Sequence, residues 1–229
     1  MNSDLNKGRD AVAGPVAILA LAVAGMLPAG SALAAMLNGQ VLGGGVPVAN
    51  STVTLWAASA SAPKPLAQTK SGSDGRFTVN APAAQGTSLY LVAQGGQPVA
   101  NKSAGNNPAI ALMTVLGAKA PGKVTINEMT TVASVWTHNQ FINGTTIQAQ
   151  PLQLKIAAGN VPSFVDLATG GWGGTIQDPL NSGQTPTMAN FATLANALSG
   201  CVTLVKADAC GSLYAAAKGP AGATPVDTL

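Results

Sequence analysis

Short runs that alternate between apolar and polar residues fill the chain from residue 37 to residue 116. In the run at 51–57 (STVTLWA), Val53, Leu55 and Ala57 share one face of a strand, and the residues between them share the other. The Asp74-Gly75 pair is a strong hairpin signal between two such runs. About seven short strands with turn residues between them predict an antiparallel β-sandwich. The clearest strands are expected at residues 37–42, 51–57, 66–70, 76–80, 88–94 and 110–116.

From residue 123 onward the apolar period becomes that of helices. Thr125 and Glu128 fit a capping box, in which Thr125 is the N-cap and Glu128 reaches back to its amide. Four apolar residues from Met129 to Trp136 follow at i, i+3, i+4 and i+7, which predicts an amphipathic helix to about residue 141. Further helices are expected at residues 151–158, 161–168, 186–205 and 210–218. The chain is therefore predicted to be α+β, with a β-sandwich over 37–116 and a separate α-helical block over 123–229.

The β-rich part resembles a known family. The segments PVANSTVTLW at 47–56, SDGRFTV at 73–79 and LYLVA at 89–93 are similar to a carboxypeptidase regulatory-like domain. The resemblance implies a prealbumin-like β-sandwich, related in shape to Cna-B repeats, that acts as an accessory module without peptidase activity. The segments INEMTTVASVW at 126–136 and QTPTMANFATLANALSGC at 184–201 resemble a region that follows such a module in exported bacterial proteins. Some of those proteins continue into NHL-type β-propeller repeats.

The N-terminus has the pattern of an export signal. Lys7 and Arg9 precede an apolar run at 11–28, and small residues near Ala34 fit a cleavage site after that residue. The alternative is an uncleaved membrane anchor, but this Ala- and Gly-rich run lacks the roughly 20 strongly apolar residues of a stable span. We therefore expect no membrane span after cleavage, and a periplasmic, cell-surface or secreted protein. No cysteine stands directly after the apolar run, which excludes a lipoprotein.

The two ends of the helical block carry further signals. Cys201 and Cys210 are nine positions apart, which in an exported chain favours one structural disulfide over a redox or metal-binding pair. Residues 224–227 (TPVD) have the form of a helix start, with an N-cap, a proline at N1 and an acid in the first turn. Because the sequence stops at Leu229, we expect a chain truncated at its C-terminus; the alternative is a frayed polar tail.

Charged residues are few, and no two basic residues are adjacent. The chain has 11 Lys and Arg against 8 Asp and Glu, a net charge of +3, with 8% charged residues overall. Nucleic-acid binding needs clustered cations that displace counterions from phosphates. The sequence therefore predicts no nucleic-acid partner.

Catalytic groups are scarce. His138 is the single histidine, which excludes a zinc peptidase site, and its place near a helix end suggests a cation that complements the helix dipole. Asp166 and Asp178 flank Trp172 in a glycine-rich loop, where the indole could stack on a sugar. Trp56 is the other candidate ligand contact; each Trp is more simply explained as an aromatic residue that packs inside the fold. We predict no catalytic residue, no cofactor and no metal ligand.

These observations favour a non-enzymatic exported structural or binding module of a larger cell-envelope or extracellular protein. The alternative is a carbohydrate-binding module with its site at Trp56 or Trp172. A further alternative is the accessory part of a secreted enzyme whose catalytic domain lies outside this chain. The expected partners are a polysaccharide or another extracellular protein.

Overall fold

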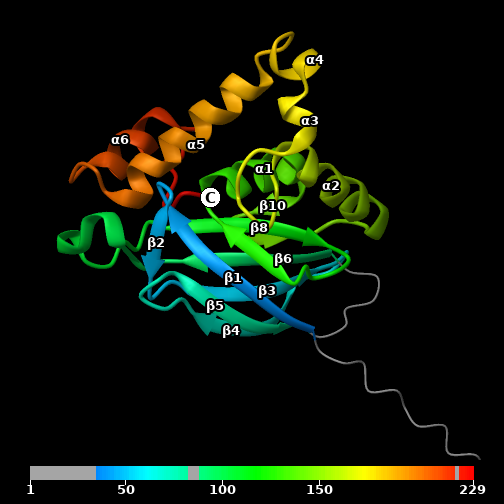
Figure 1. Cartoon of the computed structure of the whole chain (residues 1–229), viewed down its shortest axis with the longest axis horizontal. Helices are drawn as coiled ribbons and strands as arrows, with labels where there is room; N and C mark the ends of the chain where they lie inside the picture. The colour runs from blue at the N-terminus through cyan, green and yellow to red at the C-terminus, as the bar shows by residue number, and fades with distance from the viewer. Residues whose placement is uncertain (1–34, 82–87, 220–221) are drawn as a thin grey trace, which may run out of the picture. The chain divides into compact units, whose positions relative to one another are not determined.

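The computed structural model describes residues 35–81, 88–219 and 222–229, and the signal segment expected at 1–34 lies outside these ranges. The first sheet has the order β5 (Arg76–Ala81), β1 (Ala35–Gly43), β2 (Val46–Ala49) and β7 (Gln97–Pro98). A short strand β9 (Lys123–Ile126) pairs in parallel with β1. The second sheet has the order β4 (Lys64–Lys70), β3 (Thr52–Ala58), β6 (Ser88–Gln94) and β8 (Ala111–Gly117), all antiparallel (Figure 1).

The two sheets share one hydrophobic core. In β5, buried and exposed residues alternate, and Phe77 and Val79 point into this core. In β6, six consecutive residues are buried, because both faces of this central strand are covered. Leu89 and Leu91 contribute to the core between the sheets, whereas Tyr90 lies on the opposite face, in a second core that the helices cover.

Helices pack over the second sheet. The longer ones are α1 (Glu128–His138), α2 (Pro151–Phe164), α5 (Thr187–Thr203) and α6 (Ala209–Ala216). The shorter elements are the 3-10 turns η1 (Val99–Ala104) and η2 (Asn139–Phe141), the hairpin strands β10 (Ile142–Asn143) and β11 (Thr146–Ile147), and the helices α3 (Gly174–Gln177) and α4 (Pro179–Ser182). The second core joins Tyr90 and Met113 of the sheet to Ala133, Leu154 and Phe191 of the helices. Among the described residues, no helix is both long and apolar enough to cross a bilayer.

The β-rich and helical parts are joined more closely than the sequence predicted. The overall α+β class agrees with the structure. However, β9 comes from beyond residue 116 and lies in the first sheet, and Val202 of α5 belongs to the core between the sheets. The described residues from Ala35 to Leu229 form one compact unit. The helical block is thus a layer on the sheets. Eight strands precede it among the described residues at 35–81 and 88–117, where about seven were expected.

The start of α1 lies two residues later than expected. Its N-cap is Asn127, whose Oδ1 accepts a hydrogen bond from the Thr130 amide at 2.9 Å, while the Asn127 amide donates to Thr130 Oγ1 at 2.9 Å. Thr125, the expected N-cap, is part of β9 instead. The pairing of β9 with β1 holds residues 123–126 extended, so a capping box two residues further along the chain begins the helix.

One continuous helix, α2, replaces the two helices expected at 151–158 and 161–168. Gly159 and Pro162 both lie inside it, although each is unfavourable in a helix interior. Leu154, Ala158 and Val161 continue one buried stripe through this region. The burial of that stripe against the sheet outweighs the local preference for a break.

Candidate binding cleft

An apolar cleft of about 390 Å³ opens between α1, α5, α6 and the C-terminal segment. Most of its lining is apolar, contributed by Val135, Leu194, Leu198 and Leu213 with their neighbours. Leu194 is 47% exposed, so apolar surface remains open to solvent at this place. Cavities of this size and character are typical of small-molecule and side-chain binding sites.

Trp136 contributes the largest apolar side chain of the cleft. The sequence predicted that it would share the buried face of α1, but it is 39% exposed while Ala133 is fully buried. Its ring lies 6.1 Å from that of Phe164 and 6.2 Å from that of Phe191. These contacts brace one side of the indole. The helix turns Ala133 toward the sheet, and this leaves Trp136 at the edge of the contact between α1 and the sheet.

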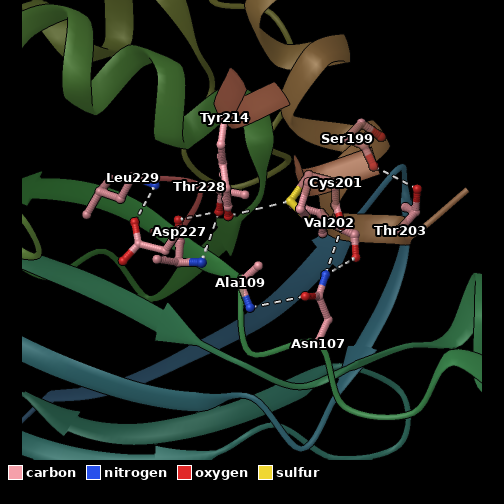
Figure 2. The surroundings of a disulfide bond; sticks show 12 residues. Asn107, Ala109, Ser199, Cys201, Val202, Thr203, Tyr214, Asp227, Thr228 and Leu229 are labelled. Atoms are coloured by element: carbon pink, nitrogen blue, oxygen red, sulfur yellow. Dashed lines mark hydrogen bonds between the residues drawn. A yellow bond between two sulfur atoms is a disulfide. The ribbon is translucent and has the colours of Figure 1, made fainter. Parts of the chain in front are cut away.

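The C-terminal segment forms one wall of the cleft. The Thr228 amide donates to Ala109 O at 3.0 Å, and the Thr228 hydroxyl both accepts from the Ala111 amide and donates to Ala111 O, each at 2.9 Å. Residues 224–227, where the sequence indicated a helix start, are not helical. Figure 2 shows the Tyr214 side chain extending from α6 toward Thr228 and Asp227. Thr228 thus ties this wall to the edge of β8.

The disulfide Cys201–Cys210 is present, as predicted, and it joins the end of α5 to α6. The Asn107 side chain donates to Cys201 O at 2.8 Å and to Val202 O at 3.2 Å, which anchors the same end of α5 to the loop that precedes β8 (Figure 2). None of the residues of α6 is buried. The disulfide is therefore a covalent tether for the helix that carries Tyr214 to the cleft.

The two tryptophans named as candidate ligand contacts lie outside this cleft. Trp56 stacks on Tyr90, with ring centroids 6.3 Å apart and an interplanar angle of 11°. Trp172 packs on Phe191 at 5.6 Å, at an angle of 50°. Both are half-buried and belong to the second core. Each therefore packs against the core of the fold, and neither lines the cleft.

His138 does not have the role that the sequence suggested. It is fully buried, and burial lowers its pKa to about 4, so the ring is neutral at pH 7 and cannot act as a cation at the helix end. Its Nδ1 lies 3.1 Å from Ser134 O and 2.8 Å from Thr137 Oγ1. Its Nε2 has no hydrogen-bond partner among the described residues. His138 is a core residue.

Glu128 is also buried, and it joins distant parts of the chain. Its Oε1 accepts a hydrogen bond from the Gly44 amide at 2.8 Å, across 84 positions of sequence, and Ser199 donates to the same carboxylate. Burial raises its pKa, and these hydrogen bonds partly oppose that effect. The expected bond from Glu128 to the Thr125 amide does not form, since Thr125 belongs to β9 and its amide donates to Leu167 O.

The two aspartates beside Trp172 serve local turns. Asp166 accepts hydrogen bonds from the amides of Ala168 and Thr169 at 2.8 and 2.9 Å, and the latter contact is the main cause of its lowered pKa. Asp178 caps α4 by accepting from the Leu180 amide at 2.9 Å. Within the described ranges, no three His, Cys, Asp or Glu residues come together as a metal site.

Sequence reasoning missed the residues that the cleft brings together. Trp136, Leu194, Tyr214 and Asp227 lie on four separate segments, and no motif connects them. The only local indication of the cleft in the sequence was the position of Trp136 on an amphipathic helix.

No family model and no curated protein matches this chain. Among solved structures, it is similar to a 9R-lipoxygenase from Cyanothece PCC8801, with 17% sequence identity and a TM-score of 0.28. The similarity covers 49% of this chain and 16% of the lipoxygenase chain. A TM-score this low supports no argument about fold or activity.

Proposed function

We propose that this protein is a non-enzymatic, exported binding module that holds an apolar ligand in the cleft between α1, α5, α6 and the C-terminal segment. The observation that carries the proposal is the cleft itself, at about 390 Å³ with a mainly apolar lining. Trp136 and Leu194 expose apolar surface there although a folded chain gains by burying it. A ligand that covers these two side chains would recover that free energy.

A binding role agrees with what the reactive side chains do. His138 and Glu128 are buried and bonded to the chain itself. Asp166 and Asp178 accept backbone amides in turns. Each of these four side chains therefore has a partner within the chain, and none of the four lines the cleft.

Export and the family resemblance remain part of the proposal. The disulfide is compatible with an oxidising compartment, as the signal pattern of residues 1–34 also suggests. Two sheets around a shared core support a prealbumin-like module that presents the helical layer. If the chain is the accessory part of a larger protein, it would bind its ligand in the same cleft.

The proposal is tested by titrating the purified protein with N-phenyl-1-naphthylamine, a neutral apolar fluorophore that brightens when it leaves water. We expect saturable binding of one probe per chain. Leu194→Gln should weaken binding, because it places an amide against the probe. Leu180→Gln is the matched control, since Leu180 is 75% exposed and does not line the cleft.

Equal affinities in the two variants, or the absence of saturable binding, would overturn the proposal. A parallel pull-down with insoluble polysaccharides tests the carbohydrate alternative. Retention that is lost in Trp56→Ala or Trp172→Ala, but not in Leu194→Gln, would favour that alternative instead.

A further inference from the structure

Among the described residues that line the cleft, Asp227 is the single one with a charged side chain. It is half-buried, and its Oδ1 accepts a hydrogen bond from the Leu229 amide at 3.0 Å. In the part of the chain that the structure describes, the one ion pair joins Arg76 to Asp74. Asp227 therefore brings a negative charge to an apolar cleft without a cation beside it. Such a charge attracts a cation more strongly than it would in bulk water, since the local dielectric constant is lower.

The place of this carboxylate is fixed by its neighbour in the chain. Thr228 is buried and makes three hydrogen bonds to Ala109 and Ala111 beside β8. Figure 2 shows Asp227 next to Thr228, below the Tyr214 side chain. Asp227 is thus held against the wall of the cleft and does not move with a free tail. A fixed charge loses little conformational entropy when it binds a ligand.

Two aromatic rings line the same cleft from opposite helices. Trp136 comes from α1 and is braced by Phe164 and Phe191, and Tyr214 comes from α6. Burial and the charge of Asp227 raise the pKa of Tyr214, so its hydroxyl stays neutral at physiological pH. The faces of such rings carry partial negative charge and attract alkylammonium groups, with Trp the most effective.

These contacts point to one class of ligand. Resting on the proposed function, we infer that the cleft binds a small organic cation, an ammonium group on an apolar body. The body covers Trp136 and Leu194, and the cationic group lies between the aromatic rings and Asp227. A neutral apolar molecule would satisfy only the first of these contacts, and an anion would be repelled.

The test compares two molecules of the same shape. Benzyltrimethylammonium and neopentylbenzene differ by the replacement of nitrogen with carbon, so only the first carries a charge. Each is used to displace N-phenyl-1-naphthylamine from the protein, and the ratio of the two affinities is the readout. We expect the cation to bind about tenfold more tightly than the neutral isostere. High salt should reduce this ratio.

Asp227→Asn should lower the ratio several-fold, because the amide keeps the acceptor for the Leu229 amide but removes the charge, while the aromatic rings remain. Asp178→Asn is the matched control, since it changes the net charge equally, lies outside the cleft and keeps the cap of α4. A ratio near one in the unaltered protein, or no change in Asp227→Asn, overturns this inference while the probe still reports the cleft. Failure of the probe itself overturns the proposed function as well.

Discussion

The Thr131 hydroxyl on α1 accepts a hydrogen bond from the Met113 amide on the edge strand β8, at 3.0 Å. One turn further along α1, Ser134 accepts from the Val115 amide at 3.0 Å. In the C-terminal segment, the Thr228 hydroxyl accepts a hydrogen bond from the Ala111 amide. Three hydroxyls thus occupy the edge of β8 where another strand would otherwise pair. This row closes a sheet edge that could aggregate, and it fixes α1 and the cleft wall on the sheet.

Thr131→Val tests this row. Valine keeps the shape of threonine but leaves the buried Met113 amide without an acceptor, so we expect a loss of about 1–3 kcal/mol in the free energy of unfolding. Urea denaturation measures it. Thr193→Val is the control, because Thr193 is exposed and its hydroxyl donates only to its own helix at Ala189 O. Its cost should stay within about 0.5 kcal/mol, and similar costs in both variants would contradict the role of the row.

The hairpin between β1 and β2 offers a comparison of two adjacent glycines. Both have positive φ angles, +59° at Gly44 and +81° at Gly45, so alanine at either should cost about 1–2 kcal/mol in backbone strain. A Cβ at Gly44 would also meet Thr203 Cγ2 at 2.8 Å, whereas a Cβ at Gly45 meets nothing within 4 Å. Gly44→Ala should therefore be destabilising by at least about 1 kcal/mol more than Gly45→Ala. Denaturation curves that superimpose would show that the hairpin does not pack tightly against α5.

His138 predicts a pH dependence of stability. Its pKa is about 4 in the folded protein against an ordinary 6.5, so the unfolded state takes up the proton first as the pH falls. The stabilisation that the neutral His138 ring gives to the folded state is fully present above pH 6.5. It is lost as the pH falls from 6.5 to 4, by about 3 kcal/mol in total. Glu128 acts in the opposite direction, because its raised pKa lets the folded state bind a proton more readily.

The variant His138→Asn isolates the histidine. Asparagine can retain a donor for Ser134 O but does not titrate. The free energy of unfolding of this variant should therefore fall less steeply between pH 6.5 and 4 than that of the unaltered protein. Urea denaturation at several pH values gives the difference. Parallel profiles for the two proteins would mean that His138 is solvated and protonates freely in the folded state.

Reduction of the disulfide should lower stability by about 2–3 kcal/mol, the loop-entropy value for a bond that spans nine positions. Thermal unfolding with and without dithiothreitol measures this loss. A double variant, Cys201→Ala with Cys210→Ala, should be insensitive to the reductant. If the unaltered protein is equally insensitive, α6 is held by contacts other than the disulfide.

The strands of this protein follow local rules, and the sequence predicted them well. The strand at 88–94 has the predicted bounds. The Asp74-Gly75 turn lies between β4 and β5, but the expected hairpin does not form, because β4 pairs with β3 in one sheet and β5 pairs with β1 in the other. The disulfide was also predictable, because two cysteines in one chain leave a single intramolecular pairing. Period-2 alternation and turn chemistry act between near neighbours, so they are readable without the fold.

Contacts between distant segments decided the rest. Parallel pairing with β1 kept Thr125 in a strand and moved the start of α1, and burial against the sheet carried α2 through Gly159 and Pro162. The neutral state of His138 follows from complete burial, which no local pattern records. Alternation along the sequence determined which segments became strands and helices, because that signal is local. Only the tertiary structure brought Trp136, Tyr214 and Asp227 to one cleft, because their packing depends on surfaces far apart in the chain.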